Sequence, residues 1–236
     1  MSTVCPTIGS LGSGFYFSPE TLAVGKEMGL DGLRWYILGR GGVLGNVEAP
    51  VVSAAFGYFN PSLIDKMWNS ARAVIEPRTA GARYHLCAAE HGRRAFADIA
   101  GLEGYNAAAE KVVAAADRDG LSLFAGIAAE PLVDDPAGRA MQLTAVLREL
   151  RGSAHLAAVV GTGLRARNAH ALKRPNDLQM FGYADGDIVA TPSDQAKLDA
   201  AERATDDMLR PAFAVLDDGE AGALTDGTRA MQAALA

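Results

Sequence analysis

The chain has 236 residues, of which 49% are hydrophobic and 7% aromatic, and its formal net charge is −6 at pH 7. This composition excludes a disordered chain and favours close-packed helices over sheets, because alanine is abundant and aromatic residues are few. The excess of acidic residues argues against a nucleic-acid surface, since such a surface needs clustered basic side chains to neutralise phosphates.

No stretch of the sequence predicts a membrane segment or a secretory leader. No apolar run approaches the ~18 residues of a membrane span. Residues 1–13 lack a basic start followed by a continuous apolar core. The two cysteines, Cys5 and Cys87, are not expected to form a structural disulfide, because Cys5 lies in the N-terminal tail. We therefore expect a cytoplasmic protein.

The chain begins with a segment that we expect to be loose, and its first helix follows. Residues 1–14 are rich in Gly, Ser and Thr, which is typical of flexible tails. Ser18-Pro19 predicts a helix start, with Ser as the N-cap and Pro in the first turn. That helix should end near Gly29. The next apolar segment, residues 32–38, is interrupted by the glycine-rich residues 39–42.

Helices are predicted along most of the remaining chain. Their ranges are residues 51–59, 63–75, 80–99, 107–116, 137–160 and 192–209, with an apolar segment at 121–129 and a last helix after residue 225. Residues 183–191 are expected to form a short β-hairpin with Asp185-Gly186 at its tip.

The sequence contains a weak internal repeat that relates Arg40-Gly41 to Arg151-Gly152. Each pair lies between an apolar helix and an apolar helix rich in small residues. This pattern suggests a diverged duplication, with two halves packed about a pseudo-twofold axis. Chance similarity in a chain rich in Ala, Gly and Arg is the alternative.

Arg148, Arg151 and His155 form the most informative group of the sequence. On a helix they fall at positions i, i+3 and i+7, so they share one stripe. Residues 156–160 are apolar on nearly every side, which is typical of a buried helix. The stripe therefore either lines a pocket or pairs with acidic side chains of neighbouring helices. In a pocket, the arginines would bind a carboxylate or phosphate and His155 would act as a hydrogen-bond partner or general base.

Further candidates surround this stripe. Arg40 lies between glycines, which either expose backbone N–H groups to an anion or allow a tight helix corner. Aromatic side chains near a helix junction could line an apolar cavity or form ordinary core. They are Tyr16, Trp35, Tyr36, Phe56 and Tyr58, and Asn60 at the junction is a further candidate. Cys87 and His91 share a helix face, but two ligands do not make a metal site. We therefore predict no bound metal.

Several motifs resemble those of one protein family. The two strongest are residues 39–45 (GRGGVLG) and residues 147–158 (LRELRGSAHLAA). Over roughly residues 16–230, order and spacing are similar to a family of helical proteins, common in actinobacteria, that is grouped with helix-turn-helix or MarR-like proteins. That family more often has Arg-Glu-His-Arg-Gly-Asp-Gly-His in the second motif, whereas this chain has Leu150, Ser153 and Ala154. The difference weakens any role that needs two imidazoles, such as paired metal ligation.

The resemblance also implies a winged-helix element near the C-terminus, followed by a dimerising helix. This chain keeps the wing-like residues 185–192, but only ten residues separate Leu172 from Tyr183. Two helices of a helix-turn-helix need about twenty residues. The recognition helix therefore has no room, which argues against DNA binding.

Together these observations predict a mainly α fold: a helical bundle of two packed halves with a small vestigial winged-helix β-hairpin near the C-terminus. We expect three parts. Residues 1–14 would be a flexible tail, residues 15–170 a helical ligand-binding core, and residues 171–236 a degenerate winged-helix-like element with C-terminal helices.

The predicted function is the binding, or the acid/base conversion, of a small acidic or carbonyl-bearing molecule. His155 is the candidate catalytic residue, and the candidate ligand-binding residues are Tyr16, Trp35, Tyr36, Arg40, Phe56, Tyr58, Asn60, Arg148 and Arg151. The sequence identifies no cofactor, no membrane partner and no nucleic-acid partner, and a homodimer is one possible assembly. The alternatives are a dimeric MarR-like transcriptional regulator and a purely structural or partner-binding helical protein.

Overall fold

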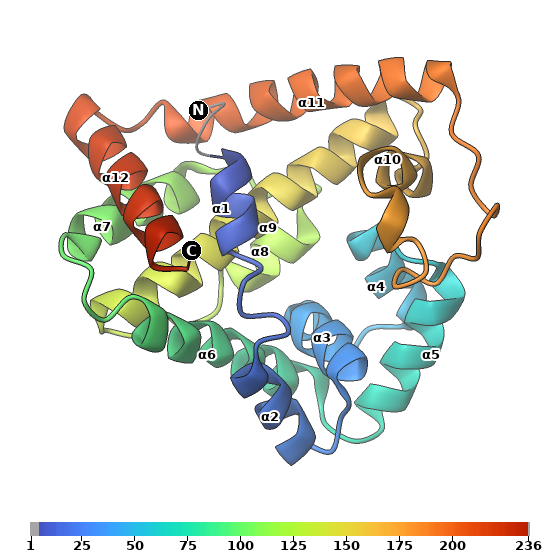
Figure 1. Cartoon of the computed structure of the whole chain (residues 1–236), viewed down its shortest axis with the longest axis horizontal. Coiled ribbons are helices and arrows are strands. Elements are labelled where there is room, and N and C mark those ends of the chain that lie inside the picture. Colours follow the sequence, from blue (N-terminus) through green and yellow to red (C-terminus); the bar gives the residue numbers. More distant parts are fainter. Residues whose placement is uncertain (1–4, 236) are drawn as a thin grey trace.

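The structure is a computed structural model that describes residues 5–235, and it is mainly α-helical (Figure 1). No strand occurs within this range. None of the helices in the described part is both long and apolar enough to cross a membrane. The helices are α1 (Cys5–Leu11), α2 (Pro19–Glu27), α3 (Gly32–Gly41), α4 (Ala49–Phe56), α5 (Pro61–Arg72), α6 (Pro77–Ala95), α7 (Leu102–Ala115), α8 (Ser122–Ile127), α9 (Pro136–Gly161), α10 (Ala166–Lys173), α11 (Pro192–Phe213) and α12 (Asp218–Ala234), with short 3-10 turns at Gly42–Leu44 and Pro175–Asp177.

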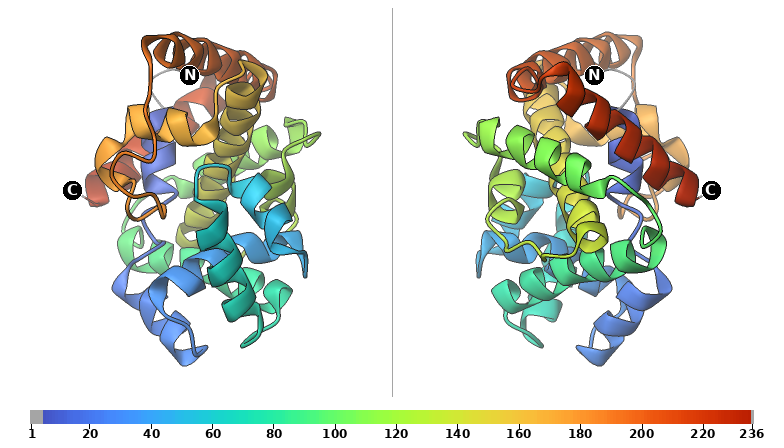
Figure 2. Two further views of the ribbon diagram at one scale, coloured as in Figure 1. Left: turned by 90° about the vertical axis from the view of Figure 1, so that its right-hand side faces the viewer. Right: turned by 90° about the vertical axis from the view of Figure 1, so that its left-hand side faces the viewer.

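The long helix α9 is the centre of the fold. Helices α1, α6, α7, α8 and α11 all pack against its 26 residues, and Figure 2 shows it running through the middle of the molecule. Most of its residues from Ala140 to Leu150 are buried. Because neighbours surround it, α9 carries buried side chains on every side rather than on one stripe.

Helix starts follow the signals expected from the sequence. Ser18 accepts a hydrogen bond from the Thr21 N–H at the start of α2, and Asn60 accepts one from the Ser62 N–H at the start of α5. A proline stands in the first turn of α2, α4, α5, α6, α9 and α11. These caps satisfy backbone donors that the first turn of a helix leaves unpaired.

The glycine-rich residues around Arg40 do not interrupt their helix, contrary to the sequence prediction. Helix α3 continues through Gly41 and then tightens into a 3-10 turn. A Cβ atom on Gly39 would collide with the ring of Tyr84, and one on Gly42 with the carbonyl oxygen of Pro77. The glycines therefore allow α3 and its 3-10 turn to approach α6 closely, which was the packing alternative for this motif.

Most of the buried core is one cluster. It extends from Ile8 in α1 to Met231 in α12, and a smaller cluster of six buried residues lies where α9, α10 and α11 meet. The larger cluster contains residues from both ends of the chain, so the two packed halves expected from the sequence do not correspond to the two clusters. Helices α11 and α12, which follow residue 171, pack on α9 and α7.

The predicted flexible tail is wrong for residues 5–11, whereas residues 1–4 lie outside the described residues. Residues 5–11 form α1, which packs against α9. Ile8 and Leu11 are both buried, 3% and 5% exposed. Their i, i+3 spacing on one helix face is the physical reason for the order, since burial of two apolar side chains outweighs the flexible composition around them.

The predicted β-hairpin is also wrong. Gly186 forms a turn with φ of +86°, and the Asp187 carboxylate accepts a hydrogen bond from the Ala184 N–H. The residues on either side of this turn remain in a loop and do not pair. Val189 is 75% exposed, so one flank has no core to cover, and an unsupported two-stranded hairpin is unstable in water.

Candidate functional site

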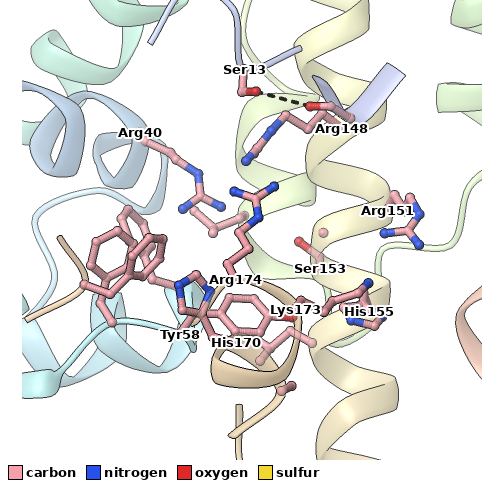
Figure 3. Close-up of a pocket in the computed structure, with 18 of the residues that line it drawn as sticks. Ser13, Arg40, Tyr58, Arg148, Arg151, Ser153, His155, His170, Lys173 and Arg174 are labelled. Atoms are coloured by element: carbon pink, nitrogen blue, oxygen red, sulfur yellow. Dashed lines mark hydrogen bonds between the residues drawn. The ribbon is translucent and has the colours of Figure 1, made fainter. Parts of the chain in front are cut away.

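A cavity of about 600 Å³ opens beside the C-terminal half of α9 (Figure 3). Five basic side chains line it, which we call the cationic wall: Arg40, Arg148, Arg151, Lys173 and Arg174. Six rings also line it, which we call the aromatic wall: Tyr36, Phe56, Tyr58, Phe59, His170 and Phe181. Residues of α1, α3, α4, α9, α10 and α11 all reach this space, so the cavity collects segments that are far apart in the sequence.

Seven of the ten residues predicted for the site line this cavity: Tyr36, Arg40, Phe56, Tyr58, Arg148, Arg151 and His155. The other three do not. Trp35 is fully buried against Tyr84, with their ring centroids 5.4 Å apart. Asn60 caps α5 and donates its side-chain amide to the Gly182 carbonyl. Tyr16 lies behind the cationic wall and reaches the site through hydrogen bonds.

Glu149 connects Arg40, Arg148 and Tyr16. Arg40 donates Nε and Nη2 to the two Glu149 oxygens, both at 2.8 Å. Arg148 donates Nη1 to Glu149 Oε1 and to the Tyr16 hydroxyl, and that hydroxyl donates to the same carboxylate oxygen at 2.8 Å. The arrangement satisfies a carboxylate whose side chain is 2% exposed.

The arginines determine the charge of this group. Burial alone would raise the pKa of Glu149, but Arg40 and Arg148 outweigh burial and lower the pKa to about 2. Burial raises the pKa of the Tyr16 hydroxyl far above its usual value, so Tyr16 stays neutral. The charged carboxylate therefore holds Arg40 and Arg148 in place at the cavity edge.

The imidazole of His155 carries its proton on Nδ1, which is hydrogen-bonded, whereas Nε2 carries none. Its Nδ1 lies 3.0 Å from the Thr205 hydroxyl, which donates its only proton to the Ala201 carbonyl. Thr205 must therefore accept from Nδ1–H, which leaves the lone pair on Nε2, 3.8 Å from Glu202 Oε1. Burial lowers the pKa of His155 to about 4, against the opposing effect of Glu202, so the imidazole is neutral at pH 7.

Glu202 on α11 completes the end of the cavity near His155. It accepts hydrogen bonds from Arg151 Nη2 at 2.9 Å and from Lys173 Nζ. Burial acts to raise its pKa, but the Lys173 hydrogen bond and the nearby His155, Lys173 and Arg151 lower it overall. Arg151 and Lys173 are therefore paired, as the structural alternative for the stripe expected, yet they still line an open cavity.

The sequence interpretation missed five residues around the cavity: Glu149, His170, Lys173, Arg174 and Glu202. Glu149 lay inside the motif already selected, next to Arg148. His170, Lys173 and Arg174 belong to α10 and its end, which the sequence interpretation did not predict as a helix. Glu202 and Thr205 lie at positions i and i+3 of the helix predicted over residues 192–209, so they share one face of α11. This spacing was the only sequence signal that pointed to them.

Three buried polar atoms of the cavity lining have no hydrogen-bond partner in the described protein. They are the Tyr58 hydroxyl, Arg151 Nε and His170 Nε2. A buried polar group without a partner costs roughly 1–3 kcal/mol. Their gathering at one cavity indicates a place where a bound molecule or water supplies the missing partners.

Comparison with known proteins identifies the family and nothing closer. No curated protein and no solved structure matches the chain. Residues 2–180 match a helix-turn-helix family, and this match spans most of the sequence, including α1 to α10 and all of the cationic wall. The chain therefore belongs to the helix-turn-helix family.

Proposed function

We propose that this chain is a small-molecule-binding protein whose ligand, an acidic or carbonyl-bearing compound, occupies the cavity beside α9. The observation that carries the proposal is the group of unpartnered polar atoms on Tyr58, Arg151 and His170, gathered at a cavity of about 600 Å³. Small-molecule sites usually measure roughly 300–1,000 Å³ and combine an apolar lining with a few converging polar groups.

The same cavity supports an enzymatic form of this function. A neutral imidazole with its lone pair on Nε2 can remove a proton from a bound molecule, and Glu202 would then stabilise the imidazolium. The low pKa of His155 makes it a weak base in the absence of ligand. A carbonyl compound with an acidic proton, held by the cationic wall, is the substrate class that suits such a base.

Mass spectrometry of the protein as purified tests the binding function directly. Native spectra should show a mass excess that disappears under denaturing conditions, and an absorption spectrum would reveal a coloured ligand. A Tyr58→Phe variant removes one unpartnered hydroxyl and should carry less of the same molecule. Failure of the purified protein to carry or take up any small molecule, from cell extract or from a metabolite library, would overturn the proposal.

A DNA-binding regulator, of MarR-like and dimeric type, is the second candidate because of the family to which the chain belongs. Helices α4 and α5 are joined by residues 57–60, with Gly57 at φ of +73°, as in helix-turn-helix units. On the exposed side of α5, however, Lys66 adjoins Asp65. Between Leu172 and Tyr183 the chain forms only the end of α10, a 3-10 turn and a loop.

A gel-shift assay with the protein's own promoter region separates the two candidates. We expect no complex at physiological salt, because few free basic side chains face outward near α5. Tight, specific and salt-sensitive binding would favour the regulator over the small-molecule protein.

A further inference from the structure

The charges around the cavity do not balance. The cationic wall has five positive groups, whereas the carboxylates paired with it are Glu149 and Glu202. This excess of three positive charges lies in a chain whose overall net charge is −6. Like charges gathered at one cavity repel one another, and an anion that binds between them relieves this repulsion. The cavity therefore favours a negatively charged ligand.

The cations differ in how many of their N–H groups are already used. Arg40 donates to Glu149 through two nitrogens and to Tyr36 through the third. Arg148 uses Nη1 alone. Arg174 makes no side-chain hydrogen bond or ion pair with any described residue, and Figure 3 shows it extending into the space that Arg40 and Arg148 face. Arg148 and Arg174 thus keep donors for a ligand, while Arg40 mainly positions its neighbours.

The aromatic wall offers apolar ring surface beside the same cations, since the Arg40 guanidinium lies 4.4 Å from the centroid of the Phe56 ring. Phe181 lies against Phe59 with ring centroids 4.1 Å apart, and against His170 at 3.9 Å. The centroids of the Tyr58 and His170 rings lie 6.2 Å apart. A planar apolar group gains buried area and favourable ring contacts on such a surface. The unpartnered Tyr58 hydroxyl and His170 Nε2 would meet a polar substituent on that group.

The size of the cavity excludes an inorganic ion as its full occupant. A water molecule takes about 30 Å³ of liquid volume, so a small ion would leave most of about 600 Å³ filled by water. The aromatic wall would then remain uncovered. A charged group and an apolar body on one molecule satisfy both walls together.

We propose that the cavity binds an aromatic oxyanion, with its carboxylate or phosphate group at Arg148 and Arg174 and its planar body on the aromatic wall. This inference rests on the proposed function and narrows the ligand to one chemical class. Guanidinium groups suit both anions, because their paired N–H groups match two oxygens of a carboxylate or phosphate.

Isothermal titration calorimetry of the whole chain tests the inference with matched probes. The probes are 2-naphthoate, the neutral analogue 2-naphthamide, 2-naphthyl phosphate and acetate. At least one naphthyl anion should bind about tenfold or more tightly than the amide, because charge-assisted hydrogen bonds are stronger than neutral ones. Acetate should bind more weakly than 2-naphthoate by a similar factor, since it lacks the planar body. Equal binding of amide and anions would overturn the inference.

Two arginine variants locate the effect. Arg174→Ala should reduce the preference for the anion over the amide about tenfold or more. Arg165→Ala removes the same charge from an exposed residue at the start of α10, outside the cavity lining, and should bind like the parent. An unchanged preference in Arg174→Ala would also overturn the inference, provided that its melting temperature shows a folded protein.

The outcomes separate this inference from the function on which it rests. Binding of a neutral or cationic molecule in the cavity, without binding of naphthyl anions, leaves the small-molecule function standing and removes the aromatic oxyanion. Absence of binding by every probe, in a protein that carries no molecule when purified, removes both.

Discussion

The carboxylate of Glu149 is buried at the centre of a hydrogen-bond network. Its oxygens accept four hydrogen bonds, from Arg40 twice, from Arg148 and from Tyr16, in a position closed to solvent. Glu110 also pairs with an arginine on another helix, but its side chain is 41% exposed. Loss of an Arg–Glu pair should therefore cost more at Glu149 than at Glu110, because water can replace a lost partner only where it reaches the remaining group.

Glu149→Gln should therefore destabilise the protein strongly. It leaves Arg40 and Arg148 without their anion in a buried position, which typically costs about 3–5 kcal/mol. Urea unfolding followed by circular dichroism measures the change. Glu110→Gln is the matched control, since it breaks a half-exposed Arg–Glu pair that water still reaches, and it should cost no more than about 1 kcal/mol. Similar losses in both variants would contradict this view of Glu149.

The protonation of His155 is a second prediction for a single residue. NMR titration of the imidazole should give a pKa near 4 and a proton on Nδ1 at neutral pH. Glu202→Gln should lower this pKa further, because Glu202 stabilises the protonated ring. A His155 that titrates near 6.5 would show that burial does not act as described.

Among the elements, close approach between α6 and α9 depends on Gly92. A Cβ atom there would collide with the Ala137 carbonyl oxygen and lie 2.7 Å from the Met141 Cβ. Both contacts belong to α9, so the two helices would have to separate along their shared face. The half-buried Gly222 in α12 has no atom within 4 Å of a Cβ placed in the same way.

Gly92→Ala and Gly222→Ala should thus change stability in opposite directions. The first should cost about 1–3 kcal/mol through overpacking. The second should add roughly 0.5–1 kcal/mol, because alanine favours the helix over glycine. Thermal unfolding of both variants under one condition checks the pair of signs. Destabilisation of the protein by Gly222→Ala would contradict the prediction and show that α12 needs this glycine.

The sequence predicts most helices because their signals are local. Ser18-Pro19 and Asn60-Pro61 mark starts that the structure contains, and the stripe Arg148, Arg151 and His155 does face one cavity. The errors occur where packing decides. Residues 5–11 are helical because Ile8 and Leu11 are buried where α1 packs against α9. Residues 183–191 stay in a loop, and Val189 is exposed there. The partners Glu149 and Glu202 could not be assigned without the folded arrangement.

Across the whole molecule, all four histidines have lowered pKa values, and burial is the main cause for each. For His85 and His155 the pKa is about 4. In the unfolded chain the histidine pKa is near 6.5. The unfolded state therefore binds more protons than the folded state between these values, so acid favours unfolding there.

Stability should be constant between about pH 6.5 and pH 8 and should fall as the pH decreases towards 4. His85 and His155 each contribute a slope of up to about 1.4 kcal/mol per pH unit within this window. Glu149, with its pKa of about 2, adds a second loss below about pH 4.5. Urea midpoints at pH 8, 6.5 and 5 measure the first window, and a His85→Gln variant should show a smaller slope. Equal midpoints at pH 8 and pH 5 would contradict the prediction.

The distribution of charge along the chain is also uneven. Residues 181–236 contain nine Asp and two Glu against three Arg and one Lys, a net charge of −7, whereas residues 1–180 have 18 basic and 17 acidic residues. The acid excess of the protein therefore lies in α11, α12 and the loop before them. The region that matches the family is close to neutral, and its local positive charge is concentrated at the cavity.

Thr205, which holds the proton of His155 on Nδ1, and Glu202, which lies 3.8 Å from its Nε2, both lie beyond the family-matched residues 2–180. The cavity thus has two origins: its basic wall and five of the six rings of its aromatic wall lie within the family-matched residues, whereas Phe181, Thr205 and Glu202 lie beyond them. Exchange of that segment between relatives would retain the cationic wall but alter the end of the cavity near Glu202 and the proton affinity of His155. Reactivity and ligand preference in such a scaffold can therefore diverge independently.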